Sequence, residues 1–419
     1  MNEKLTKTNE IKVPELLMPG GSLQKAKIAA LYGADAIYGG FQKYGLRAAA
    51  DNFDRDQLKE VVDYCHERDV KFYLTLNSFF HEEDYQSFLK DLNFFDQLGI
   101  DAYIISDVGV MSFVSENSGT PIHVSTQASV CNAYSAKAFK SLGAKRVVLG
   151  REVSLEDAKN IKDQVDVEIE MFIHGSMCMA FSGNCVISNY TAGRDSNRGG
   201  CAHSCRFEYK LKSEEQEKVS TFMSSKDLNG LELLGLYTQN SIDTIKVEGR
   251  MKSVNYVGTV ASTYSHALNE IKKTGSLSAQ TLKNCQNELL KTMNREFTTA
   301  SLVEKADQTS IFNEREYKEG EYQIVGEVLE VNSDQFAIVK VRAPLFADDR
   351  LELLIPESSE NNKFTQEFAC SLKDVLDRDL EKANPGKLIK IPFQEGMQVR
   401  QLIRKVTVAS DKGTLSHEL

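Results

Sequence analysis

The stretch ELLMPGGSLQKAKIAALYGADAIYGG at residues 15–40 carries the pattern from which we infer the fold. Two short apolar runs, Glu15–Met18 and Asp35–Gly39, flank the amphipathic segment Ser22–Leu31 and predict a strand, a helix and a second strand. Ser22 is placed to cap the N-terminus of the helix, and Gly33 to end it. Strands that return in parallel through a helix are the repeating unit of α/β proteins.

The same alternation continues to about residue 250. Six further candidate strands follow, with helix-like segments between most of them: Lys71–Asn77, Asp101–Ser106, Pro121–Gln127, Lys145–Gly150, Val167–His174 and Asp243–Glu248. Eight parallel strands with crossover helices predict a TIM barrel. Phe222–Ser225 is a possible ninth strand. A doubly wound open sheet is the alternative, although no G-x-G-x-x-G follows the first strand.

Polar residues stand at the end of nearly every candidate strand. Examples are Asn77-Ser78, Ser106-Asp107, Arg151-Glu152, His174-Gly175 and Glu248-Gly249-Arg250. In a barrel these positions converge on the C-terminal face, where active sites are built. We therefore expect the site at that face.

The pattern of apolar and polar residues in the sequence changes near residue 318. From Tyr322 onward, short alternating runs such as YQIVGEVLEV and QFAIVKVRA are separated by turn signals, without helices. We expect a tail at 1–12, a TIM-barrel-like domain at 13–317, a small antiparallel β-barrel domain at 318–409, and a disordered tail at 410–419. The fold class is α/β, followed by this second, all-β domain.

Charge and hydropathy limit the possible partners. The formal net charge of the 419 residues is −10, which argues against non-specific coating of nucleic acid. Locally, Val186 to Lys212 holds five basic and two acidic residues, a net +3. No apolar run approaches the roughly 20 residues of a membrane span, and the N-terminus shows no leader. We expect a cytoplasmic protein with no membrane contact.

Four of the eight cysteines cluster in the spacing Cys-x6-Cys-x15-Cys-x3-Cys, at Cys178, Cys185, Cys201 and Cys205. Clustered cysteines in a reducing compartment indicate metal binding or catalysis. Zinc sites usually contain closer cysteine pairs, so an iron–sulfur cluster is favoured. Zinc, and buried or nucleophilic cysteines, remain as alternatives. Neither H-E-x-x-H nor G-x-S-x-G occurs, so standard hydrolase motifs are absent from the sequence.

The segment EMFIHGSMC at 170–178, followed by Ser182-Gly183-Asn184-Cys185, resembles the signature of the collagenase-like peptidase family, family U-thirty-two. The blocks PELLMPGGS, YGADAIYGG, YGLRAAADNF and KVEGRMKS agree, over about residues 13–300. The block NREFTTA at 294–300 departs from the family pattern, because two glycines are replaced.

The resemblance is strongest to a branch of the family that hydroxylates tRNA. It implies formation of 5-hydroxyuridine at the wobble position, independent of molecular oxygen and dependent on prephenate. It also implies a four-cysteine cluster, of the 4Fe–4S type, and tRNA as the partner, with a second family member or a second copy of the chain as a further partner. Sister branches hydroxylate ribosomal RNA, and older members are reported to cleave collagen. A redox enzyme acting on RNA, a protease and a non-catalytic iron–sulfur subunit therefore stay open.

Residue roles follow as hypotheses. Glu248 and His174 are candidates for proton transfer. Arginine forks suit carboxylates and phosphates. We expect an anionic donor or a phosphate to be bound by Arg194, Arg198, Arg250 and Lys252. A flipped-out base would stack on an aromatic ring, for which the candidates are Tyr38, Tyr44, Phe79 and Tyr190.

Overall fold

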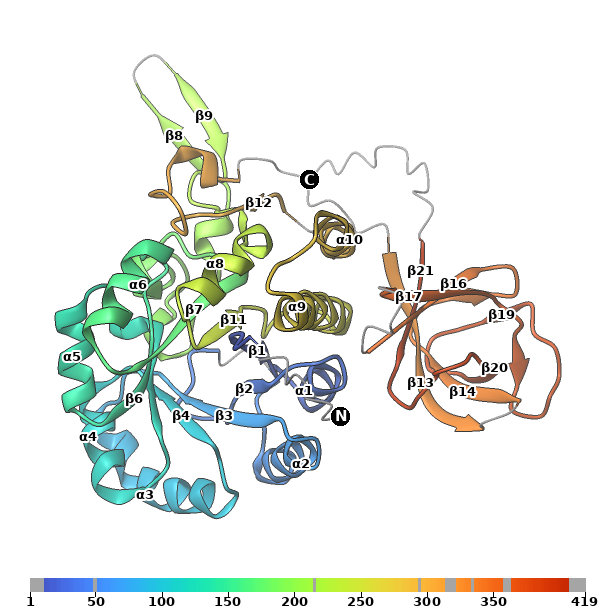
Figure 1. Ribbon diagram of the computed structural model, residues 1–419, viewed down its shortest axis with the longest axis horizontal. Helices are drawn as coiled ribbons and strands as arrows, with labels where there is room; N and C mark the ends of the chain where they lie inside the picture. The colour runs from blue at the N-terminus through green and yellow to red at the C-terminus, as the bar shows by residue number, and fades with distance from the viewer. Residues whose placement is uncertain are drawn as a thin grey trace, which may run out of the picture.

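The structure of the chain is a computed structural model, which describes residues 11–47, 51–213, 216–292, 295–312, 322–332, 335–356 and 363–406. Two domains are seen in Figure 1: a barrel ringed by helices, and a smaller all-β domain on the far side of helices α9 and α10. The expected boundary at residue 318 and the tail at 410–419 lie outside the described residues, as does most of the tail at 1–12.

The first domain is a closed parallel barrel. Its strands are β1 (Glu15–Pro19), β2 (Ala36–Gly40), β3 (Lys71–Leu76), β4 (Ala102–Ile105), β5 (Ile122–Val124), β6 (Ala144–Val148), β7 (Glu168–Ser176) and β11 (Thr244–Val247). Each strand pairs in parallel with the next, and β11 pairs with both β7 and β1, which closes the ring. The TIM-barrel prediction is confirmed with all eight expected strands, and the open-sheet alternative is wrong.

The possible ninth strand at Phe222–Ser225 is wrong. Only Ser225 of that segment makes a β-bridge, to Ile311. The extra strand begins slightly later, as β10 (Asp227–Asn229), which pairs antiparallel with the end of β7 and in parallel with β12 (Phe297–Thr298). Because β7 already has both barrel neighbours along its first half, this addition lies outside the ring.

Helices cover the outside of the barrel. They are α1 (Leu23–Leu31), α2 (Arg55–His66), α3 (Glu82–Gln97), α4 (Val108–Asn117), α5 (Ala133–Ser141), α6 (Leu155–Gln164), α8 (Leu234–Gln239), α9 (Val254–Thr274) and α10 (Ala279–Leu290). The predicted cap at Ser22 is confirmed, since its side chain accepts from the amide of Lys25, and Ser154 caps α6 in the same way by accepting from the amide of Asp157. Each cap satisfies a helix amide that has no partner within the helix.

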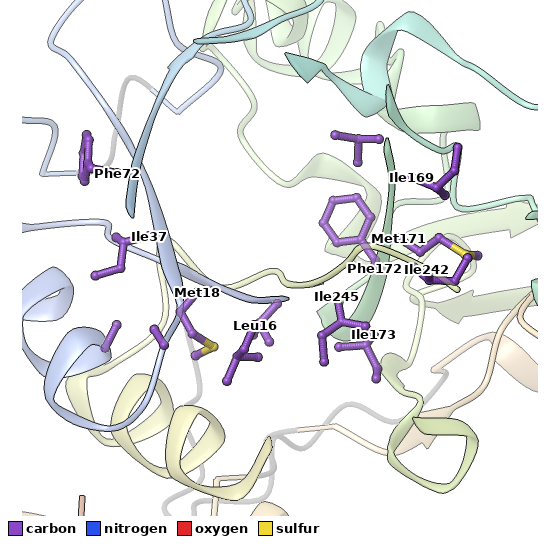
Figure 2. Packing of buried hydrophobic residues seen from close by; sticks show 14 of the residues in the cluster. Leu16, Met18, Ile37, Phe72, Ile169, Met171, Phe172, Ile173, Ile242 and Ile245 are labelled. Atoms are coloured by element: carbon purple, nitrogen blue, oxygen red, sulfur yellow. The ribbon is translucent and has the colours of Figure 1, made fainter. Parts of the chain in front are cut away.

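The main core lies between strands and helices. Leu16, Met18, Ile37, Ile169 and Ile245 point outward from the barrel strands into this layer (Figure 2). Side chains alternate along a strand, so the residues between them face the barrel interior. A separate cluster of Leu17, Ala36, Tyr38, Tyr73, Ala102 and Ile104 forms the apolar part of that interior.

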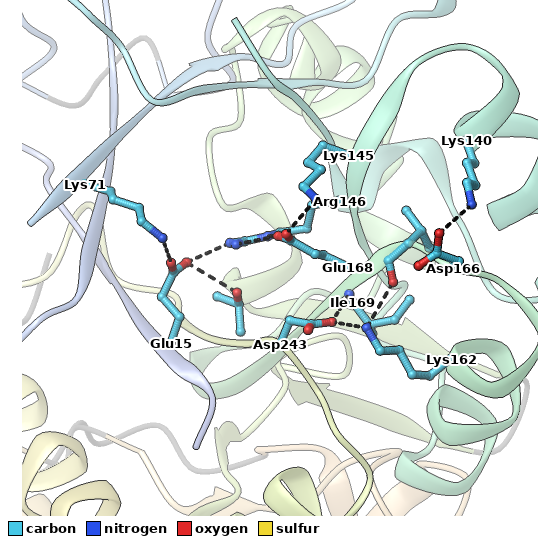
Figure 3. A network of polar contacts seen from close by, with 12 residues as sticks. Glu15, Lys71, Lys140, Lys145, Arg146, Lys162, Asp166, Glu168, Ile169 and Asp243 are labelled. Carbon is cyan, nitrogen blue, oxygen red and sulfur yellow. Dashed lines mark hydrogen bonds and ion pairs between the residues drawn. The ribbon is translucent and has the colours of Figure 1, made fainter. Parts of the chain in front are cut away.

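The N-terminal end of the barrel is closed by paired charges. Arg146 Nη1 lies 2.7 Å from Glu15 Oε1 and 3.4 Å from Glu170 Oε2, and Lys246 Nζ lies 2.8 Å from the other Glu170 oxygen. Figure 3 shows the outer part of this network, where Lys71 meets Glu15. Buried charges persist only where they are paired, so the network fixes the floor of the barrel.

The second domain is a curled antiparallel sheet. Its strands are β13 (Tyr322–Asn332), β14 (Phe336–Val341), β16 (Arg350–Leu354), β17 (Thr365–Ala369), β18 (Lys373–Asp374), β20 (Leu388–Pro392) and β21 (Leu402–Val406). A small pair, β15 (Leu345–Phe346) with β19 (Lys382–Ala383), accompanies it. The small antiparallel β domain was predicted from the alternating pattern.

The two domains are joined by buried polar contacts. Leu402 N donates to the hydroxyl of Tyr32, on the barrel side, at 3.0 Å. Arg404 of β21 is buried between Glu288 of α10 and Glu352, with contacts of 2.7 and 2.6 Å. Within the described ranges, no helix is both long and apolar enough to cross a membrane.

Candidate active site

A small cavity of about 40 Å³ opens at the C-terminal face of the barrel. Its wall comes from the ends of several strands and the segments after them: Tyr38, Leu46, Arg47, Thr75, Asn77, Ile104, Ser125, Thr126, Gln127, Arg151, Phe172, Lys246, Glu248 and Arg250. Four of these, Asn77, Arg151, Glu248 and Arg250, are among the strand-end residues that were expected to converge there. We call this space the barrel-mouth cavity.

Positive charge predominates in the barrel-mouth cavity. Glu248 is its one acidic lining residue, against Arg47, Arg151, Lys246 and Arg250. Burial works to raise the pKa of Glu248, but the four surrounding cations lower it below its usual range, so the carboxylate stays charged. Arg151 Nη2 lies 3.9 Å from Glu248 Oε2. The lining therefore carries a formal excess of cations, which favours an anionic ligand.

Among the residues that the structure describes, two arginine nitrogens at this cavity are buried without a hydrogen-bond partner, namely Nε of Arg151 and Nε of Arg250. Burial, with Arg47 adding to the effect, lowers the pKa of Arg250 to about 10. A buried hydrogen-bond donor without an acceptor costs free energy of folding. Such donors are rare unless a ligand or a water molecule accepts their hydrogen bond. The geometry suits a ligand with carboxylate or phosphate oxygens.

A second cavity, of about 260 Å³, adjoins the first and shares Arg47, Arg151 and Glu248 with it. Three of the four clustered cysteines line it, Cys178, Cys201 and Cys205. We call this space the cysteine cavity. Its remaining lining residues are Ser176, Met177, His203, Arg206, Gly249, Met251, Lys252 and Arg295.

The cysteine segment is folded by short elements after β7. They are η2 (Phe181–Gly183), α7 (Ile187–Ala192), η3 (Ser196–Arg198) and η4 (Ser204–Arg206). At Gly175 the backbone has φ +107°, and a Cβ there would lie 2.1 Å from the carbonyl oxygen of Glu248. Glycine is thus required where the segment leaves β7 and passes over the barrel mouth.

All four thiols lie in one neighbourhood. The pKa of Cys205 is raised to about 11, mainly by burial and in part by the nearby Cys178, Cys201 and Cys185, while Arg206 works to lower it. Cys185 accepts from Ile187 N at 3.4 Å, and its own amide donates to Asn197. Arg206 Nη1 is buried without a partner beside these thiols. Three thiols that line one cavity, with the thiol of Cys185 nearby, fit the ligand set of an iron–sulfur cluster.

The four thiols are not arranged as ligands of a single metal ion. Among the residues that the structure describes, no group of three or more His, Cys, Asp or Glu side chains is arranged to hold a metal ion. All eight cysteines are free thiols.

The other predicted site residues divide into two groups. Glu248 and Arg250 line the barrel-mouth cavity, and Lys252 lines the cysteine cavity, where its Nζ lies 3.2 Å from Asp227. The structure does not bring Arg194, Arg198 or His174 to either lining.

Arg198 instead forms an ion pair of 2.8 Å with Asp84 of α3, and Arg194 is exposed on the loop after α7. His174 is buried among aromatic rings, with Nδ1 at 3.3 Å from the hydroxyl of Tyr264. Burial lowers the pKa of His174 to about 3, with Lys252 adding to the effect, so the ring is neutral.

The aromatic candidates are also separated. Tyr38 lines the barrel-mouth cavity, where its hydroxyl donates to Val247 O. Tyr44 is buried and donates to Asp91. Phe79 and Tyr190 are exposed. The cavity residues missed by sequence reasoning are Arg47, Arg151, Lys246 and Arg206, although the first three lie in quoted blocks or strand ends.

Hydrolytic groups are not assembled here. Ser182 is buried, and its hydroxyl donates to Glu152 at 2.9 Å while its amide donates to the same carboxylate. Over the described ranges, no histidine forms a hydrogen bond with a serine or cysteine side chain. The nucleophile–base pair of a hydrolase needs such a contact.

Two family models match this chain, one over the barrel domain and one over the second domain. The model of peptidase family U32 matches residues 21–311, and the model of the U32 C-terminal domain matches residues 320–404. The tRNA hydroxylation protein P1 of Bacillus subtilis is 34% identical, over 94% of this chain and 95% of that protein. A 23S rRNA 5-hydroxycytidine synthase of Escherichia coli is 31% identical over 81% of this chain, but over 52% of its own length. A collagenase of Porphyromonas gingivalis is 31% identical, over 68% and 72%.

Proposed function

This chain belongs to peptidase family U32, and from that premise we propose that it is an RNA-modifying enzyme that hydroxylates tRNA. The proposed product is 5-hydroxyuridine at the wobble position. The observation that carries the proposal is the pair of adjoining cavities, one rich in cations and one lined by thiols, which share Arg47, Arg151 and Glu248. The similarity to a tRNA hydroxylation protein over nearly the full length of both chains supports it.

The chemistry sets the requirements for such a site. Replacing the C5 hydrogen of uridine by a hydroxyl group is a two-electron oxidation. When oxygen gas is not the oxidant, another compound must accept the two electrons, and the oxygen atom must come from that compound or from water. We propose prephenate as the co-substrate. Its two carboxylates match the cationic barrel-mouth cavity, where the unpaired Nε atoms of Arg151 and Arg250 are available to bind oxygens.

We further propose that Cys178, Cys185, Cys201 and Cys205 hold a 4Fe–4S cluster. When bound, the cluster would supply redox chemistry beside the bound co-substrate. Gly175 allows the ligand segment to cross the barrel mouth at close range. Glu248 limits the excess positive charge and is placed to hold or receive a proton between the two cavities. Because the cysteine cavity is contiguous with the barrel mouth, both parts act on one substrate.

A reconstitution experiment tests the proposal. Protein purified without oxygen is incubated with tRNA and prephenate, and the digested nucleosides are analysed by mass spectrometry. We expect 5-hydroxyuridine only when protein, iron–sulfur cluster and prephenate are all present. Failure of the complete mixture, with full cluster occupancy, would contradict the proposal. Ribosomal RNA in place of tRNA tests the alternative substrate, which is suggested by the second relative.

The peptidase alternative rests on the collagenase relative. It is tested by incubating the same protein with gelatin. The contacts of Ser182 with Glu152 and the neutral, ring-enclosed His174 give no nucleophile–base pair for it. The third alternative, a non-catalytic subunit that acts with a second family member or a second copy, predicts product only when that partner is added.

A further inference from the structure

Three exposed aromatic rings lie on the segment that carries the four clustered cysteines. Phe181, Tyr190 and Phe207 all lie on the cysteine segment and have 57%, 88% and 48% of their surface exposed. Exposed Met179 and Val186 lie on the same segment, and Met251 of the cavity lining is exposed as well. Concentrated apolar exposure of this kind marks an interaction surface.

These rings are held in place by the loop that carries the cysteines. Helix α7, which bears Tyr190, is tied to the Cys201–Cys205 loop: Ala202 N donates to Ser188 Oγ at 3.0 Å, and Thr191 Oγ1 donates to Ser204 Oγ at 2.7 Å. Phe207 follows η4 directly. The rings therefore project outward from a fixed base at the cavity.

Basic side chains stand between and beside the rings. Arg194 is exposed four residues after Tyr190, and Lys210 and Lys212 are exposed just after Phe207. Lys212 ends β8 (Tyr209–Lys212), which forms with β9 (Glu217–Ser220) a hairpin that projects beyond the barrel (Figure 1). The stretch from 186 to 212 carries five basic and two acidic residues, although the whole chain has net charge −10. Arg198 and Lys210 form ion pairs with Asp84 and Glu217, which leaves the exposed Arg194 and Lys212 to meet a phosphate.

We propose that this surface, the cysteine rim (Phe181, Tyr190, Arg194, Phe207 and Lys212), binds the unpaired loop of an RNA. The inference rests on the proposed function and extends it by assigning the residues that recognise the substrate. Unpaired bases stack on aromatic rings while basic residues bind the phosphates between them. A base drawn from that loop enters beside the thiols, because Phe181 and Phe207 lie close in the chain to Cys178 and Cys205, which line the cavity.

Charge complementarity favours RNA over a protein partner. The rim joins rings to cations in a chain that is otherwise acidic, as expected for a surface that binds a polyanion. A protein partner would bind the rim by burying its apolar surface and would not need bases to stack on the rings. Leucine in place of a ring separates the two cases, since it keeps apolar area but removes the flat face.

The test measures binding rather than turnover. The probe is a fluorescent anticodon stem-loop RNA, with a fully paired duplex of the same length for comparison. We expect Tyr190→Leu and Phe207→Leu each to weaken stem-loop binding on the order of tenfold, with little change for the duplex. Tyr190→Trp should retain binding. Phe346→Leu is the matched control, because Phe346 has 45% of its surface exposed but lies on β15 of the second domain.

The outcomes separate the rim from the proposed function. Wild-type binding by both leucine variants, in a protein that hydroxylates tRNA, would overturn the rim and leave the function intact. Selective loss of stem-loop binding in those variants would support the rim, even if the wild-type protein hydroxylated no RNA. Equal binding of duplex and stem-loop, or an equal loss in Phe346→Leu, would also overturn the rim.

Discussion

Arg151 Nη2 lies 3.9 Å from Glu248 Oε2, at the point where the barrel-mouth cavity and the cysteine cavity meet. Arg151 follows β6 and Glu248 follows β11, so the two residues come from opposite sides of β7 in the ring. The pair therefore lies in the wall that the cationic cavity shares with the cavity of the thiols.

Removing an arginine of the barrel mouth should weaken the binding of an anionic co-substrate. We expect Arg151→Met and Arg250→Met each to lower the affinity for prephenate tenfold or more, on the order of the 1.5–3 kcal/mol of a hydrogen bond to a charged group. Isothermal titration calorimetry under nitrogen measures this. Arg198→Met is the control, because Arg198 is paired with Asp84 outside both cavities. An equal loss in the control would contradict the assignment.

Neutralising Glu248 should have the opposite effect on binding. Glu248→Gln leaves Arg47, Arg151, Lys246 and Arg250 without their shared carboxylate, so the cavity becomes more positive. We expect tighter binding of prephenate together with loss of hydroxylation, because the proton-holding group is gone. Calorimetry and nucleoside analysis on the same preparation check the two effects. Weaker anion binding would show that Glu248 holds the ligand directly.

Each cysteine of the segment should be needed for the cluster. Replacing Cys178, Cys185, Cys201 or Cys205 by serine should abolish the visible absorption and the iron content of protein isolated without oxygen. Cys65 and Cys370 are buried elsewhere, in the cores of the two domains, so Cys65→Ser and Cys370→Ser should keep the iron. Stoichiometric zinc without iron in the wild-type protein would contradict the cluster.

His174 should make the fold sensitive to acid. Its pKa in the folded protein is about 3 and its ordinary value is 6.5, so below pH 6.5 the unfolded chain binds a proton that the folded chain does not. The free energy of unfolding should therefore fall from pH 6.5 toward pH 3, by up to about 1.4 kcal/mol per pH unit from this group. Denaturant titrations should show a smaller fall for His174→Gln. Parallel curves for the two proteins would contradict a buried, neutral His174.

The barrel was predictable because each strand is a short apolar run. Between most of these runs the sequence shows helical periodicity, which indicates a helix before the next strand. The ion network of Arg146, Glu170 and Lys246 inside the barrel was not, since its members lie on different strands and no spacing in the sequence links them. The extra strand was predicted at Phe222–Ser225 but begins at Asp227, five residues after the predicted start.

The site was predicted in part for a similar reason. Glu248 and Arg250 stand at a strand end, and the cysteine spacing is a local signal. Arg198 and His174 have side chains that could act in a site. In the structure, however, Arg198 pairs with Asp84 and His174 contacts Tyr264, and both partners are distant in the sequence. Arg47 and Arg151 were missed as ligand-binding residues because only the closed ring brings them to Glu248.

Wobble hydroxylation in cells grown without oxygen tests the central claim most directly. Transfer RNA from a deletion strain, and from the same strain carrying the intact gene, is digested and its nucleosides are measured by mass spectrometry. Oxygen-dependent hydroxylases are silent under these conditions. We expect 5-hydroxyuridine and its derivatives to disappear in the deletion strain, to return with the intact gene, and not to return with Cys201→Ser. Unchanged levels in the deletion strain would contradict it.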